Sequence, residues 1–442
     1  MMFNKILTFS QNKANYLYKN SLFLQHIDTL IFLSIVFVFI LSTFMSSDII
    51  GFCALITGFL TLIKLLTKPG THISCKGFEL WLLAYFMLVV VSLFGSSLFL
   101  ASLKGFFKTL TYLIFYSSLV IYLRDNKSKI PFLLGVIALC LGSQVLLGLL
   151  QNFAKVSEIS TWQDVSRLNP EQVMTRVYGS LKPLNPNLLG GYLVLGMSSV
   201  FAKGLIGICD KNYRVGAGWI LLGILTVIAI VLTGCRGAYL ALFASFATMV
   251  VISAKFFWDD YKKLYISIIG GLTVFATAAV LSISSLRARV VSIFAMRADS
   301  SNSFRFNVYN SSIDMFKDNW LLGIGIGNLN FREIYGLYMK TGFDALSAYN
   351  IFLETAVESG IFALIAFGGF LLSVVVGCIN FVLHSGKQRE IIIISAILVS
   401  LVATIIHGMV DTVFFRPQLQ FIFWFMMAVA SVMLNYDNEC NA

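Results

Sequence analysis

Twelve long apolar stretches recur along this chain of 442 residues, and they constrain its fold more than any other feature. A helix of roughly 17–25 apolar residues crosses the ~30 Å hydrocarbon core of a bilayer. Because 58% of the residues are hydrophobic and only 12% are charged, a soluble fold would expose large apolar patches to water. We therefore predict an all-α, polytopic membrane protein. The predicted spans are 29–45, 49–67, 78–95, 105–123, 130–153, 188–207, 217–234, 238–257, 264–283, 360–383, 391–410 and 418–435.

The basic residues between these spans fall mainly on one side of the predicted membrane. With a cytoplasmic N-terminus, the inner segments carry fifteen Lys and Arg, whereas the short outer loops carry three. Positive charge gathers on cytoplasmic loops, so segment 1–28 and the tail 436–442 are both expected inside. The same bias explains most of the net charge of +11. We expect the lipid bilayer, and not nucleic acid, to be the partner of this basic chain.

Two outer connections are much longer than the others. They are residues 154–187 and residues 284–359, and the second divides the spans into blocks at 29–283 and 360–435. Long loops in compact proteins are usually functional, so recognition or chemistry is expected at the outer face. The second loop is near neutral but densely charged for this chain. Its charged residues are Arg287, Arg289, Arg297, Arg305, Lys317, Arg332, Lys340, Asp299, Asp314, Asp318, Glu333, Asp344, Glu354 and Glu358.

The second long loop also has helical periodicity. Apolar residues recur on one face over 304–318, with Ser303 as a plausible cap, and again over 346–358. The run of Gly323, Gly325 and Gly327 between them predicts a turn. We expect a pair of helices that lie at the outer membrane surface over a cleft.

Four segments in order carry a family resemblance. They are LNPNLLGGY at 184–192, TGCRGAY at 233–239, the stretch from Arg305 to NWLLGIGIGN at 319–328, and AYNIFLE followed by ESG at 348–360. Together they resemble the O-antigen ligase superfamily, membrane proteins that join or polymerise lipid-linked sugars. The resemblance runs from about residue 185 to residue 415. It implies a bacterial inner-membrane location, with the chemistry at the outer face.

One position departs from the ligases of that superfamily. They carry a His immediately before the Asn of the fourth segment, where it is thought to act as the base on the acceptor hydroxyl. This chain has Tyr349 there, and a phenol with a pKa near 10 is a poor base at neutral pH. The sequence LSAY at 346–349 instead resembles a cyanobacterial branch of proposed bicarbonate transporters, associated with inorganic-carbon accumulation.

Two arginines are candidate anion-binding residues. Arg236 lies at an outer junction between two spans, where a guanidinium can bind phosphate or carboxylate, although it can equally anchor or cap a helix. Arg305 opens the predicted helix 304–318, an unfavourable end for a cation, which suggests an outside anion or Asp314 as partner. The alternative for Arg305 is an ordinary solvated charge.

Five further residues are candidates around the fourth segment and the eleventh span. Asn350 with Glu354 four residues later can bind a hydroxylated ligand, or Asn350 can cap the helix. Tyr349 and Glu354 are the catalytic candidates, although a Tyr is more often a packing residue. His407 and Asp411, also four residues apart near the outer end of the eleventh span, are expected to share a helix face. They can relay protons, position an anion-binding group, or form a structural pair.

These observations leave three functions open. The branch resemblance favours transport of a small anion such as bicarbonate. The alternative is a glycosyltransferase that acts on polyprenyl-diphosphate-linked sugars at the outer face, with Arg236 and Arg305 on the diphosphate and an acid such as Glu354 replacing the missing His. The third is a membrane assembly protein without chemistry. The partners are then the bilayer and either a small anion or a lipid-linked diphosphate sugar, with no metal or cofactor expected.

Overall fold

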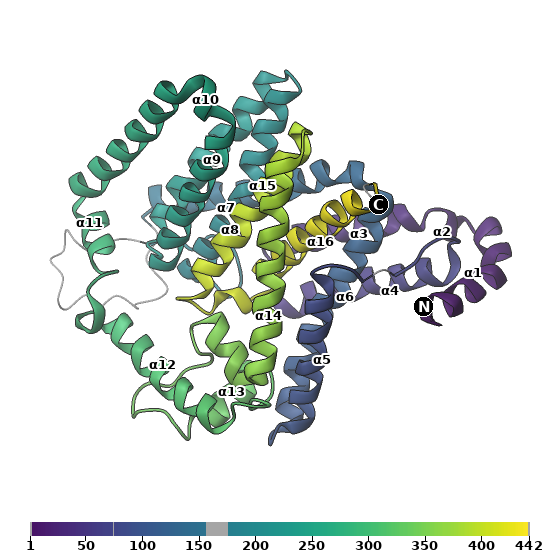
Figure 1. The fold of residues 1–442 in the computed structure, drawn as a ribbon. Helices are drawn as coiled ribbons and strands as arrows, with labels where there is room; N and C mark the ends of the chain where they lie inside the picture. The colour runs from purple at the N-terminus through teal and green to yellow at the C-terminus, as the bar shows by residue number, and fades with distance from the viewer. Residues whose placement is uncertain (1, 74, 156–175, 441–442) are drawn as a thin grey trace.

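The computed structural model describes residues 2–73, 75–155 and 176–440, and the part of the chain that it describes is helical with no strand (Figure 1). The predicted all-α fold class is therefore confirmed. The helices are α1 (Met2–Asn20), α2 (Leu22–Gln25), α3 (Ile27–Leu41), α4 (Ser47–Thr67), α5 (Glu79–Gly95), α6 (Phe99–Asp125), α7 (Ile130–Phe153), α8 (Pro186–Cys209), α9 (Tyr213–Leu232), α10 (Arg236–Ser282), α11 (Ser284–Val291), α12 (Ser300–Asp318), α13 (Asn328–Tyr335), α14 (Ile351–His384), α15 (Gln388–Gly408) and α16 (Pro417–Cys440).

The apolar helices lie where the apolar stretches of the sequence are. Among the described residues, nine helices are long and apolar enough to cross a membrane, and α3 and α5 are shorter apolar helices. Helix α10 includes two of the predicted spans, because its backbone leaves the helical conformation only at Tyr261. Figure 1 shows α10 bending sharply before it continues to α11. The number of crossings and their sidedness stay predictions.

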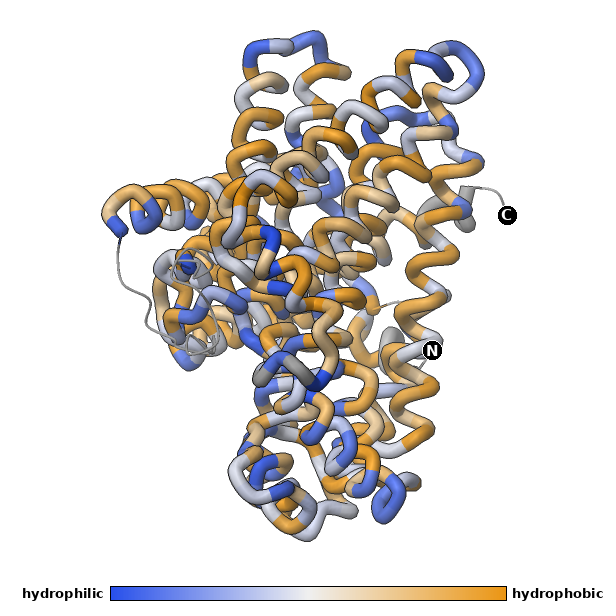
Figure 2. Tube along the Cα trace, turned by 90° about the vertical axis from the view of Figure 1, so that its left-hand side faces the viewer, coloured by the Kyte–Doolittle hydropathy of each residue, from blue (hydrophilic) through white to orange (hydrophobic). Residues whose placement is uncertain are grey.

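Hydrophobic and hydrophilic residues are separated along the long helices. Figure 2 shows hydrophilic residues in the loops at the top and bottom of the view and some at mid-height, with mostly hydrophobic lengths of helix between them. Long apolar helices are what contact with lipid requires, since lipid tails offer no hydrogen bonds.

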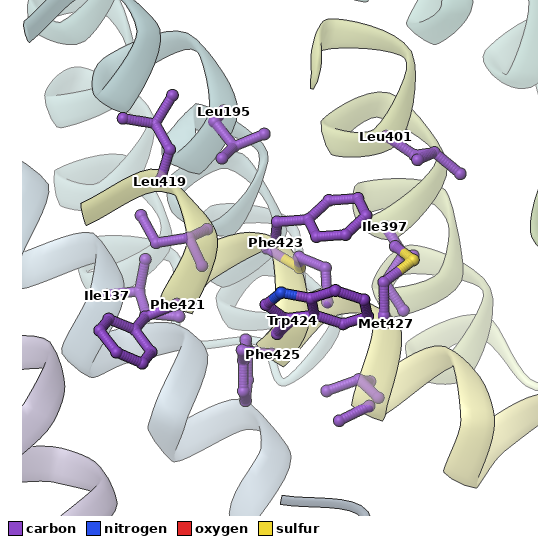
Figure 3. Packing of buried hydrophobic residues seen from close by; sticks show 14 of the residues in the cluster. Ile137, Leu195, Ile397, Leu401, Leu419, Phe421, Phe423, Trp424, Phe425 and Met427 are labelled. Carbon is purple, nitrogen blue, oxygen red and sulfur yellow. The ribbon is translucent and has the colours of Figure 1, made fainter. Parts of the chain in front are cut away.

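The core of the bundle is built around α16. In its most apolar stretch 94% of residues are buried, whereas in α10 the corresponding share is 0%. Phe421, Phe423 and Trp424 of α16 pack among apolar side chains of neighbouring helices (Figure 3). Helix α16 contacts α6, α8, α14 and α15, so this one helix ties the two sequence blocks of spans together.

The loop 284–359, here called the cap, contains α11, α12 and α13 and has a small apolar core of its own. This core distinguishes the cap from an ordinary connecting loop, because buried apolar contacts fix its helices against one another. Its buried residues, together with Val357 at the start of α14, are Val308, Met315, Ile324, Phe331, Tyr335, Ala345 and Ala348.

The cap corrects several sequence-based boundaries. The first helix begins at Ser300 and not at residue 304, because Asp299 and not Ser303 accepts from the amide of Asn302 as its cap. The second predicted helix begins only at Ile351, with Asn350 as its N-cap, and continues into the tenth apolar stretch. Helix α13 was not predicted. The glycine run is confirmed as a turn, since its three glycines all have positive φ.

Candidate functional site

Asp411 lies at the centre of a polar network beneath the cap. Its Oδ2 accepts a hydrogen bond from Asn187 Nδ2 at 3.0 Å and faces Arg305 Nη2 at 3.4 Å. Its Oδ1 accepts from the amide of Thr412 at 2.8 Å. The side chain is only 3% exposed. A carboxylate this buried needs such partners, and three separate segments of the chain supply them.

Arg305 joins this network from the second turn of α12. Its Nη1 donates to the hydroxyl of Ser301 at 2.9 Å, and its guanidinium stands over the ring of Tyr349 at 5.8 Å. The predicted alternative partner, Asp314, pairs instead with Lys317. The buried Nε of Arg305 has no hydrogen-bond partner among the described residues. Arg305 thus retains an unused donor at a site where unpaired donors are costly.

Arg236 has an acidic partner that is distant in sequence. Its Nη1 lies 2.8 Å from Asp299 Oδ1 and donates to the carbonyl of Ser292 at 3.2 Å. Burial alone would raise the pKa of Asp299, but the hydrogen bond and charge of Arg236 outweigh it, so the net pKa of Asp299 is lowered. Arg236 therefore ties α10 to the start of α12.

Two more arginines, which the sequence did not indicate, surround the turn that immediately precedes α10. Arg176 Nε donates to the carbonyl of Thr233 at 2.8 Å, and Arg289 Nε donates to that of Gly234 at 2.6 Å. Burial, followed by the charges of Arg176 and Arg236, lowers the pKa of Arg289 to about 10. Both arginines donate to backbone carbonyl groups. Because every residue has a carbonyl, such contacts cannot be recognised from the sequence.

We call Arg176, Arg236, Arg289 and Arg305 the arginine cluster. The amide of Asn187 links it across α8, since its Oδ1 accepts from Arg176 Nη2 at 2.5 Å and its Nδ2 reaches Asp411. The described network holds these four guanidinium groups against two carboxylates, of Asp299 and Asp411. Like charges gathered this closely are unfavourable alone, so the cluster is suited to an anion with more than one negative charge.

His407 and Asp411 do not share a helix face, contrary to the sequence prediction. Helix α15 ends at Gly408, so Asp411 lies beyond it. His407 Nε2 instead lies 3.6 Å from the Sγ of Cys235, and its buried Nδ1 has no hydrogen-bond partner among the described residues. Close packing places it there, because a Cβ on Gly191 would lie 3.1 Å from its Cε1.

Tyr349 and Asn350 have local roles. Asn350 Oδ1 accepts from the amides of Phe352 and Leu353, at 2.9 and 3.1 Å, as the N-cap of α14. Burial, followed by the charge of Asp411, raises the pKa of Tyr349 to about 12. The phenol therefore stays protonated at neutral pH and is no base. Of the two alternatives for Asn350, capping is the one that its contacts match.

The two acids of α14 line a cavity of about 240 Å³ between α5, α6, α14 and α16. Glu354 is 2% exposed and Glu358 is 6% exposed. Glu358 Oε1 accepts from the amide of Gly327 at 2.8 Å, whereas Glu354 Oε2 has no hydrogen-bond partner among the described residues. We call this space the carboxylate cavity. Its polar and aromatic lining includes Lys104, Lys108, Thr109, Tyr85, Tyr112, Phe414, Phe415, Gln420 and Trp424.

A break in α14 positions this cavity. At Gly360 the backbone has φ +79° and ψ 178°, which is essentially open to glycine alone. The break frees the carbonyls of the preceding turn, and the glycine run of the cap uses them: the amide of Ile324 donates to Val357 O and that of Gly325 to Glu358 O, each at 2.9 Å. The cap is thus fastened to the residues that carry the two acids.

Comparison with known proteins agrees with the sequence resemblance in part. Residues 221–368 match the family model of the O-antigen ligases. The match supports the O-antigen ligase-like superfamily. It includes Arg236, Arg289, Arg305, Glu354 and Glu358, and it ends before His407 and Asp411. A search of the curated proteins found no match. The matched segment is shorter than the resemblance predicted from 185 to 415, and nothing in it supports the bicarbonate-transporter branch.

Proposed function

We propose that this protein is an outer-face glycosyltransferase of the O-antigen ligase type that acts on polyprenyl-diphosphate-linked sugars. The observation that carries the proposal is the arginine cluster, in which guanidinium groups outnumber carboxylates inside and beside the segment that matches the ligase family. A diphosphate is the anion that such a cluster suits best, because guanidinium binds phosphate oxygens in pairs.

The chemistry of this transfer follows from the charge that develops. The acceptor hydroxyl attacks the anomeric carbon of the donor sugar, and the bond from that carbon to the diphosphate oxygen breaks. The bonding electron pair leaves with the lipid diphosphate, so negative charge grows on its oxygens. Arg305, whose Nε has no partner among the described residues, and Arg236 are the cations that we assign to that charge.

Asp411 and Asn187 act in this proposal by holding Arg305 in place. Asp411 faces Arg305 at 3.4 Å and is itself held by Asn187. An arginine fixed in this way loses little conformational freedom when it binds the diphosphate. Asp299 has the same relation to Arg236.

The family match favours glycosyl transfer over small-anion transport, which was the first of the sequence-based hypotheses. A basic cluster also attracts bicarbonate, so the two functions need separate experiments. Proteoliposomes with labelled bicarbonate test the transport hypothesis, for which uptake above empty vesicles is the required result.

The proposed function is tested by deleting the protein from its bacterial host and measuring the pool of polyprenyl-diphosphate-linked glycan. If the protein consumes this donor, the pool accumulates in the deletion strain and falls when the wild-type chain is restored. Restoring Arg305→Gln should leave it high. Restoring Arg332→Gln, which changes an exposed arginine of the cap, should lower it as the wild type does. An unchanged pool in the deletion strain contradicts the proposal.

A further inference from the structure

We propose that the carboxylate cavity is the acceptor site and that Glu354 is the base that takes the proton from the acceptor hydroxyl. This inference rests on the proposed function, and it assigns the role that the missing His leaves open. The carboxylate cavity adjoins the arginine cluster but is lined by different residues, and each region then serves one of the two substrates.

The first observation is the state of Glu354 itself. Its side chain is 2% exposed, it lines the cavity, and its Oε2 has no hydrogen-bond partner among the described residues. Leaving a buried carboxyl oxygen without a partner costs free energy, so such a group is typically kept for a ligand or a reaction. Glu358 differs in this respect: its Oε1 accepts from the amide of Gly327, and neither of its carboxyl oxygens is both buried and without a partner among the described residues. Glu358 is a positioning residue that holds the glycine run.

The second observation is the lining of the cavity. The aromatic side chains of Tyr85, Phe367 and Trp424 offer apolar surface, while Glu354 and Lys108 offer polar groups that hydroxyls can bind. At about 240 Å³ the cavity is slightly smaller than the usual range for ligand pockets, roughly 300–1,000 Å³. A single sugar ring, with one apolar face and several hydroxyls, is the class of acceptor group that fits this lining.

The third observation is that the two regions adjoin. Asp411 belongs to the arginine network, and Phe414, three residues later, lines the carboxylate cavity. Three residues span at most about 11 Å. On the other side, Tyr349 lies under the guanidinium of Arg305 and immediately precedes the cap residue of α14, which carries Glu354. A donor diphosphate at Arg305 and an acceptor ring near Glu354 are therefore neighbours.

The proton balance of the step is complete. In the proposed step Glu354 begins as the carboxylate. As the acceptor oxygen bonds to the anomeric carbon, its proton passes to Glu354 Oε2, and the electron pair of the broken bond leaves on the diphosphate. Glu354 ends as the neutral acid and returns its proton to water after the product leaves. Lys104 and Lys108 line the same cavity, so the two carboxyls are not the sole charges there.

The experiment compares Glu354→Gln with Glu333→Gln, which makes the same change on an exposed acid of the cap. Each variant is re-expressed in the deletion strain at matched protein level, and the initial rate of consumption of the lipid-linked glycan is measured. Loss of a general base should slow Glu354→Gln by roughly 10²-fold or more, and Glu333→Gln should match the wild type. Binding of farnesyl diphosphate, a short polyprenyl diphosphate, should be unchanged in both purified variants.

A second variant guards against a folding failure. Thr109→Phe leaves both acids in place and fills the carboxylate cavity from α6, so it should also stop transfer while farnesyl diphosphate still binds. Wild-type consumption rates in either Glu354→Gln or Thr109→Phe overturn this inference and leave the proposed function standing. If the wild-type chain itself consumes no lipid-linked glycan, the proposed function fails, and the inference fails with it.

Discussion

The arginine cluster and the carboxylate cavity adjoin each other, yet they meet the cost of buried charge in different ways. In the cluster, Arg236 and Arg305 are held by Asp299 and Asp411, at 2.8 and 3.4 Å. In the cavity, Glu354 keeps one oxygen without a partner among the described residues. Paired charges are already in place for binding, whereas an unpartnered carboxyl is ready to accept a hydrogen. The arginine cluster is therefore suited to holding a leaving group, and Glu354 in the cavity is suited to accepting a proton.

The largest expected effect comes from removing the cation of the cluster that has an unused donor. Arg305→Gln should lower the rate of glycosyl transfer by roughly 10²–10³-fold, because stabilisation of the developing diphosphate charge is lost. Arg305→Lys should recover only part of the rate, since an ammonium lacks the planar fork of donors. The measurement is the consumption rate of lipid-linked glycan together with farnesyl diphosphate binding, which should weaken in both variants.

The matched control for this pair is Arg332→Gln. Arg332 also lies in the cap, but it is about half exposed and pairs with Asp344 at the surface. Its loss should leave transfer at the wild-type rate. Equal losses in Arg305→Gln and Arg332→Gln would show that general cap charge, and not the cluster, is what matters.

The next largest effect is expected from the break in α14 at Gly360, which positions the carboxylate cavity and not the arginine cluster. Gly360→Ala should destabilise the protein by about 2 kcal/mol, because only glycine adopts this backbone conformation easily. The new Cβ would also lie 2.2 Å from the carbonyl oxygen of Leu321. Thermal unfolding measures the loss, and transfer should fall more than farnesyl diphosphate binding does.

Gly368→Ala is the control for that variant. It lies in the same helix, and a Cβ there meets nothing within 4 Å. Ala is the better helix former, so stability should stay the same or rise slightly. A loss at Gly368→Ala as large as at Gly360→Ala would argue against a special role for the break.

A smaller effect concerns the pairing within the cluster. Asp299→Asn should keep the cap of α12, since Asn is also a good N-cap, but lose the charge that faces Arg236. We expect a loss of about 1 kcal/mol at neutral pH.

Because the pKa of Asp299 is lowered in the folded protein, this stabilisation is present above its unfolded pKa, near 3.9, and is lost as the pH falls through the folded value. The stability difference between wild type and Asp299→Asn should therefore persist down to about pH 4 and shrink below it. Denaturation followed across that pH range measures it. A difference that grows as the pH falls would contradict the assignment.

The smallest effect is expected outside both regions. Lys317 pairs with Asp314 at 2.8 Å, but the two side chains are 66% and 59% exposed. Such pairs contribute roughly 0–1 kcal/mol, so Lys317→Ala should change neither transfer nor stability measurably. A clear loss of transfer in this variant would extend the functional surface over the outside of the cap.

The sequence predicts the fold better than the site. Apolar stretches are a strong signal, because lipid admits few alternatives to long helices, and the helices of the bundle lie where those stretches are. Starts and ends of helices in the cap were predicted less well. Asp299 displaced Ser303 as a cap because both residue types serve that role and only the fold chooses between them.

The candidate site depends on contacts between residues far apart in the chain. Nothing near Arg236 in sequence points to Asp299, 63 positions away, or brings Arg176 and Arg289 to the same turn. The spacing of His407 and Asp411 led to a wrong prediction, because it assumed that the helix continues to Asp411, whereas the helix ends at Gly408. A signal for Glu354 and Glu358 was present, because two acids four residues apart at the start of an apolar stretch are unusual.

The most direct test of the proposed function is the structure of the protein in lipid nanodiscs with farnesyl diphosphate bound. We expect the diphosphate in the arginine cluster, with phosphate oxygens about 2.7–2.9 Å from guanidinium nitrogens of Arg305, including its Nε, or of Arg236. The lipid chain should leave toward the bilayer, and the carboxylate cavity should stay free of it. A diphosphate seated away from these arginines would contradict the account.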